Sequence, residues 1–181
     1  MLLTRIKSFW PYAGLPIIVI SLLLIRVGRT EPFVMLQHEL VIIFGYAAAI
    51  LDLKTRRIPN SLVLAMLAAW VLTMTPMMFF NTGAAIGLLK DAALGFAVGG
   101  GLFLLVYLVS HKGLGGGDVK FIAVAGLYLG LRGAIPVILY GTVLAALTGM
   151  SLILLKKIGR KDAIPLAPFI FAGILATVFL Q

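Results

Sequence analysis

The stretch that decides the fold covers residues 40–60 and reads LVIIFGYAAAILDLKTRRIPN. Its first part is an unbroken apolar run. Together with the mostly apolar residues from position 33, this run is long enough to cross the hydrocarbon core of a bilayer. Pro59 then ends the helix, because the residue before a proline disfavours helical backbone angles. The stretch therefore predicts a membrane helix that ends in a polar turn and carries Asp52 near its end.

The rest of the chain repeats this pattern of apolar segments separated by short polar turns. Of its 181 residues, 62% are hydrophobic and 12% are charged, and the mean hydropathy is +1.15. Because the alternating pattern of barrel strands is absent, we predict an all-α fold: a polytopic integral membrane helical bundle of about six to seven transmembrane helices. The expected segments are about 10–27, 33–51, 61–80, 92–110, 119–131, 134–155 and 164–180.

Residues 1–181 are expected to form a single transmembrane domain. Within it, residues 1–32 would form a retained first helix and an outer turn, since no clear cleavage site of a signal peptide follows the first apolar run. The fifth segment is short for a span, so it is tilted, partly re-entrant or extended by the glycine loop before it. Small residues in the stretches 95–101 and 141–149 predict close packing between helices.

The positive net charge of the chain is explained by its contact with a membrane. The formal net charge is +9, and in a membrane protein basic residues set topology and contact anionic lipids, so no nucleic-acid partner is expected. An N-terminus inside the cell places eleven of the fifteen lysines and arginines in the cytoplasm, as the positive-inside rule favours. Asp91 is expected to pair with Lys90 on the outer side. With no cysteine and two histidines, neither a metal site nor a cofactor is expected.

Two acids stand out in this apolar chain. Two predicted helices separate Asp52 from Asp118, so both fall at the same membrane boundary. A carboxylate near hydrocarbon is costly, which favours a functional role. Such a pair can share a proton, one member acting as general base on water and the other as acid toward a peptide carbonyl. Each also has a structural interpretation: Asp52 as an interfacial acid paired with Lys54, Arg56 or Arg57, and Asp118 as the N-cap of the next helix.

The residues flanking these acids suggest how a substrate would approach. Gly115, Gly116 and Gly117 leave backbone groups free to lie beside an extended peptide. Lys120, less than one turn after Asp118, is interpreted as an interfacial anchor, or as a residue that tunes the two acids or contacts the substrate backbone.

The tripeptide Ile58-Pro59-Asn60 separates two helices. We expect it to stop the first helix and to provide Asn60 or Ser61 as the N-cap of the second.

These motifs together resemble the type IV prepilin peptidase family of intramembrane aspartic proteases. The carrying residues are Asp52…Ile58-Pro59-Asn60 and Gly115-Gly116-Gly117-Asp118-Val119-Lys120, and the stretch Ile164-Pro165-Leu-Ala-Pro168-Phe169 is similar to the family's Pro-x-x-Pro-Phe sequence. The resemblance covers roughly residues 40–175. It implies a peptidase core over residues 33–181, with Asp52 and Asp118 as catalytic dyad. It also implies a prepilin or pilin-like precursor as substrate, whose basic leader is removed after a glycine at the cytoplasmic face of the inner membrane.

One departure from the family pattern narrows this expectation. Longer members carry a cytoplasmic domain with paired Cys-x-x-Cys zinc motifs and a methyltransferase activity, whereas this chain has no cysteine. The short, single-activity form is therefore the closer resemblance, with cleavage expected and N-methylation left open.

A second hypothesis from another class is a proton-coupled transporter or channel component that uses the same two acids. The position of both acids at segment ends, rather than near the bilayer midplane, favours the peptidase.

Overall fold

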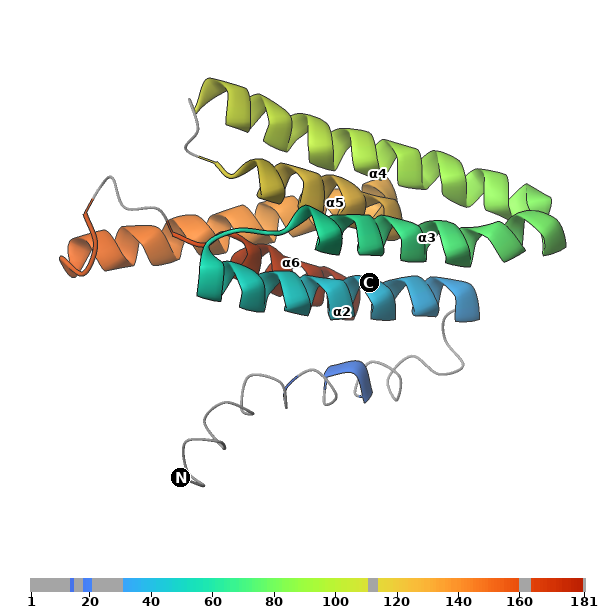
Figure 1. The fold of residues 1–181 in the computed structure, drawn as a ribbon, viewed down its shortest axis with the longest axis horizontal. Coiled ribbons are helices and arrows are strands. Elements are labelled where there is room, and N and C mark those ends of the chain that lie inside the picture. The colour runs from blue at the N-terminus through green and yellow to red at the C-terminus, as the bar shows by residue number, and fades with distance from the viewer. Residues whose placement is uncertain (1–13, 15–17, 21–30, 111–113, 160–163, 181) are drawn as a thin grey trace.

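The computed structural model describes residues 14, 18–20, 31–110, 114–159 and 164–180, which form a bundle of helices (Figure 1). The helices are α2 (Pro32–Thr55), α3 (Asn60–Phe80), α4 (Thr82–Val109), α5 (Gly116–Leu154) and α6 (Ala167–Leu180). Within the described residues, α2 to α5 are each long and apolar enough to cross a membrane, and α6 is a shorter apolar helix. The prediction of an all-α membrane bundle is confirmed. Most of the first expected segment, 10–27, lies outside the described residues.

Helix α5 contains two of the expected segments and reverses direction at Gly130. Its first half runs antiparallel to α4, because Gly99 faces Ile122 while Gly95 faces Gly126. Its second half runs antiparallel to α6, because Gly141 faces Ile170 while Val137 faces Gly173. The expected segments 119–131 and 134–155 are thus the two arms of a helical hairpin (Figure 1). The first arm begins at Gly116, so the glycine stretch lengthens the short fifth segment, which was one of its three interpretations.

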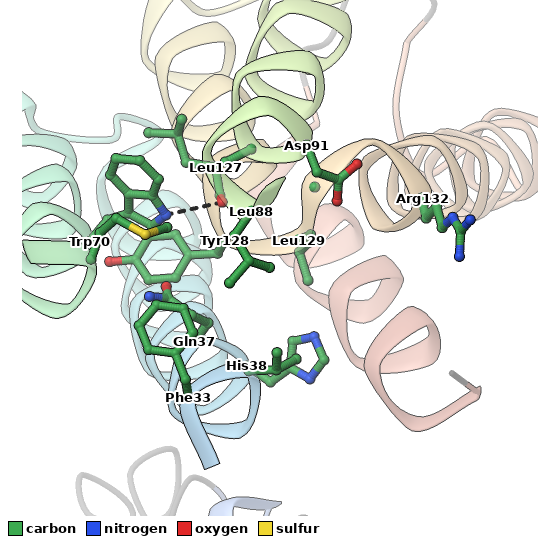
Figure 2. A pocket seen from close by; sticks show the side chains of 14 residues that line it. Phe33, Gln37, His38, Trp70, Leu88, Asp91, Leu127, Tyr128, Leu129 and Arg132 are labelled. Atoms are coloured by element: carbon green, nitrogen blue, oxygen red, sulfur yellow. Dashed lines mark hydrogen bonds between the residues drawn. The ribbon is translucent and has the colours of Figure 1, made fainter. Parts of the chain in front are cut away.

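The reversal depends on an unusual backbone conformation at Gly130, and side chains of two neighbouring helices form hydrogen bonds on either side of it. Gly130 has φ 63° and ψ −174°, a combination that is essentially restricted to glycine. Just after it, the Leu131 N–H donates to Asp91 Oδ1 of α4 at 3.2 Å. Just before it, Leu127 O accepts from Trp70 Nε1 of α3 at 3.0 Å (Figure 2). Asp91 was expected to pair with Lys90, but it serves here as the acceptor for an N–H that the turn leaves outside the helical ladder.

Small residues allow the hairpin to lie close to α4. A side chain at Gly95 or Gly126 would collide with the backbone of the facing helix. Gly173 of α6 is equally restricted, since an added Cβ would lie 2.6 Å from Val137 O. The prediction of close packing through small residues therefore holds at 95–101, where the two glycine-bearing helices touch backbone to backbone.

We predict that Gly130→Ala lowers the free energy of unfolding by about 1–3 kcal/mol, because alanine is strained at this backbone conformation. Its Cβ would also collide with the Asp91 carboxylate. Thermal unfolding in detergent measures the change. Gly87→Ala is the matched control, since nothing lies within 4 Å of an added Cβ on Gly87. Equal melting temperatures for the two variants would contradict the role assigned to Gly130.

Candidate active site

Asp52 lies in the last turn of α2 and is almost fully buried, with 5% of its surface exposed. Its Oδ2 accepts a hydrogen bond from the Ala167 N–H at 3.0 Å. Ala167 is the first residue of α6, where backbone N–H groups have no partner within their own helix. The carboxylate at the end of α2 therefore provides the hydrogen-bond acceptor for an N–H at the start of α6, and this contact fixes the Asp52 side chain.

Asp118 lies in the first turn of α5 and is half-buried. The N-cap of α5 is Gly115, whose carbonyl accepts the Asp118 N–H at 3.1 Å. Asp118 is therefore not the N-cap that its structural interpretation proposed. It sits inside the helix, where a negative charge is favoured by the positive end of the helix dipole.

Both acids line one cavity of about 250 Å³ at the same end of the bundle, hereafter the aspartate end. The cavity contains two carboxylates and two guanidinium-bearing side chains. Its lining residues are Asp52, Arg56, Arg57, Ile58, Gly115, Gly116, Gly117 and Asp118. In chemical terms, this is a small cavity that two acids from different helices line together with two guanidinium groups. Among the described residues, no three His, Cys, Asp or Glu side chains gather in a way that could hold a metal ion.

The three glycines beside Asp118 have three different surroundings. An added Cβ on Gly115 would lie 2.7 Å from Asp118 Oδ2, so this glycine leaves room for the carboxylate. An added Cβ on Gly117 would lie 3.0 Å from Ile58 O, so this glycine lets the two motifs pack together. Gly116 has nothing within 4 Å and is the glycine with space for another molecule.

The Ile-Pro-Asn turn joins the two motifs. Ile58 is buried against Gly117, and Pro59 is the N-cap of α3. Asn60 was a candidate N-cap, as was Ser61, but Asn60 is the first residue of α3 and its Oδ1 accepts from Lys120 Nζ at 3.0 Å. Lys120 is thus bound to the turn, a contact that none of the interpretations of this lysine included.

Comparison with known proteins identifies the family of this chain. Residues 40–150 match the model of the type IV leader peptidase family. The chain belongs to this family. The matched range includes Asp52, Asp118 and the glycines at positions 115–117.

Curated relatives of this leader peptidase family member share its sequence over most of its length. A protein of Bacillus subtilis named prepilin leader peptidase/N-methyltransferase is 32% identical over 135 residues, which are 72% of this chain and 50% of the relative. A protein of the same name from Burkholderia pseudomallei is 31% identical over 147 residues, 75% of this chain and 45% of the relative. The chain thus spans about half the length of the relatives it matches. No solved structure matches it significantly.

Sequence reasoning missed two polar features of this family member. The first is the Ala167 N–H, a backbone group that no residue type in the sequence reveals. The only hint is Pro168 after it, because proline is common near the start of a helix. Glu39 is a third acid, 8% exposed, and both its carboxylate oxygens lack a hydrogen-bond partner. It lies about 20 Å from Asp52 along α2, so it is not part of the cavity at the aspartate end.

We predict that Gly117→Ala lowers the free energy of unfolding of this leader peptidase family member by about 1 kcal/mol, because the turn at Ile58 must move to admit a methyl group. Gly116→Ala is the matched control one residue away, where the methyl group enters open space. Thermal unfolding in detergent compares them. A Gly116→Ala variant as destabilised as Gly117→Ala would show that the close approach of the two motifs is not what selects glycine.

Proposed function

We propose that this protein is an intramembrane aspartic endopeptidase that removes the basic leader of prepilin-like precursors, with Asp52 and Asp118 as its catalytic dyad. The observation that carries the proposal is that these two acids, from different helices, line one cavity. Membership of the type IV leader peptidase family and the names of the curated relatives support the same activity.

The chemistry requires one ionised and one protonated carboxyl group. The ionised group takes a proton from water as the water oxygen attacks the carbonyl carbon of the scissile bond, and the protonated group donates to the carbonyl oxygen. Collapse of the tetrahedral intermediate breaks the C–N bond, and the leaving amine receives a proton. Because Asp52 Oδ2 is held by the Ala167 N–H, its Oδ1 is the oxygen free to contact water or substrate.

The proposed site faces the cytoplasm from the inner membrane. Six of the eight lysines and arginines among the described residues lie at the aspartate end (Figure 1), which is the distribution of a cytoplasmic boundary. These six are Lys54, Arg56, Arg57, Lys120, Lys156 and Lys157, with Lys90 and Arg132 at the other end. A leader rich in basic residues would remain on this side, while the apolar helix beyond the cleavage point enters the bilayer.

The substrate contacts proposed within the cavity are the backbone at Gly115, Gly116 and Gly117, and Lys120 is proposed as a further contact outside the cavity lining. Gly116 is the strongest of these, because it has open space above it. Lipids of the membrane surround the helices, and no nucleic acid takes part. The proposal covers the peptidase reaction and does not extend to methyl transfer.

We predict that Asp52→Asn and Asp118→Asn each reduce leader removal by at least about 10²–10⁴-fold, because neither variant can complete both proton transfers. The assay follows cleavage of a co-expressed precursor with a basic leader, a glycine at the cleavage point and an apolar helix.

Asp91→Asn is the matched control for this experiment. It also removes a carboxylate from the bundle but keeps an oxygen that can accept the Leu131 N–H, so we expect wild-type cleavage. Wild-type cleavage by either dyad variant would refute the proposal. A proton flux in vesicles that is lost in the same two variants, without any cleavage by the wild type, would favour the transporter.

A further inference from the structure

A second hollow lies beside the aspartate end, and its lining residues are different from those of the cavity of Asp52 and Asp118. It is a groove of about 540 Å³, with walls from α3 and α4 and a floor from the first arm of α5. Its lining is apolar except for one residue, Lys120. The lining residues are Val63, Leu67, Phe96, Ala97, Gly100, Gly101, Leu104, Val119, Lys120, Ala123 and Val124.

The groove is placed where a bound helix would lead directly to the dyad. Its floor begins at Val119, the residue after Asp118, and its α4 wall runs from Phe96 to Leu104, about 12 Å of helix. Figure 1 shows α3 and α4 close together at their connecting turn and farther apart toward the aspartate end. The groove lies between helices long and apolar enough to cross a membrane, and its α5 floor ends next to Asp118.

Gly101 is unlike the neighbouring glycines of α4. Gly95, Gly99 and Gly100 each face an atom of α5 that an added Cβ would contact within 3.4 Å, so the packing of α5 explains them. Gly101 has nothing within 4 Å, although it lines the groove. Together with Ala97, one turn earlier, it gives the wall a surface on which the largest side chain is a methyl group, which lets the backbone of another helix approach closely.

The charge of the groove selects the kind of segment that can enter. Lys120 stands at the end nearest Asp118 and is exposed. The positive charge of this ammonium group would repel a cationic segment, whereas an apolar segment could pack against the remaining apolar lining. The substrate in the proposed function has this polarity: its basic residues precede the scissile bond and its apolar helix follows it.

We propose that this groove is the docking site for the first two or so turns of the substrate's apolar helix. The inference rests on the proposed function, and adds the surface that holds the substrate after the cleavage point. It assigns Gly101 and Ala97 as the points of closest approach and Lys120 as the residue that excludes a cationic segment. The helix and the groove together hold the peptide bond before the helix in line with the cavity of Asp52 and Asp118.

The test compares two tryptophan substitutions on the same helix. Gly101→Trp fills the groove, and Gly87→Trp places the same side chain in open space outside it. Each variant is given a single-pass precursor in proteoliposomes and a short soluble peptide that contains the leader and cleavage point without the helix. We expect Gly101→Trp to lower kcat/KM for the precursor about tenfold, with the short peptide unaffected. Gly87→Trp should change neither.

The other outcomes separate the groove from the proposed function. Wild-type cleavage of the precursor by Gly101→Trp, or an equal loss of activity on both substrates, overturns the proposal that the groove binds the substrate helix. The proposed peptidase function is then unaffected. If the wild type cleaves no precursor, the proposed function itself fails.

Photocrosslinking decides the occupant independently of cleavage. A photoreactive residue at position 101, in an Asp118→Asn background, is expected to crosslink to the helix of the precursor, and the same residue at position 87 is not. Crosslinking at position 101 only to lipid, or only to a second copy of this chain, overturns the proposal.

Discussion

The hydrogen bond from the Ala167 N–H to Asp52 Oδ2 is the constraint on which the aspartate end depends. At 3.0 Å it joins the end of α2 to the start of α6, two helices far apart in the sequence. A carboxylate at the C-terminal end of its own helix meets an unfavourable dipole, and the N-terminus of α6 supplies a favourable one. Burying Asp52 is therefore possible because a second helix begins where the first one ends.

The remaining parts of the site follow from how α5 is held. The turn at Gly130 sends the first arm of α5 along α4, and the facing glycines allow the two backbones to touch. At the other end of that arm, Gly117 packs on Ile58 and Lys120 is bound to Asn60. The start of α5 is thus attached to the turn after α2, so Asp118 reaches the cavity of Asp52. Under the proposed function, this places both acids at the boundary where a membrane-bound precursor would leave the bilayer.

The membrane bundle, the helix-ending motifs and the placement of both acids at one end could be predicted from the sequence, because apolar length and proline act locally. Contacts between distant residues could not. Asp91 was expected to pair with its neighbour Lys90, but the register of α4 against α5 brings it to the Leu131 N–H. A run of identical glycines likewise does not reveal that its members have different surroundings. Those surroundings depend on the side chain of Asp118, which lies near Gly115, and on the turn at Ile58, which lies near Gly117.

The most direct test of the central claim is the proximity of residues 52 and 118 in the membrane. The chain contains no cysteine, so the double variant Asp52→Cys/Asp118→Cys provides two unique thiols for a short bifunctional thiol reagent. Mass spectrometry of the digested protein should find them crosslinked, and should find no such product for Asp52→Cys/Asp91→Cys, whose second thiol lies at the opposite end. Failure to crosslink 52 with 118, or equal crosslinking of both pairs, would contradict a shared catalytic cavity.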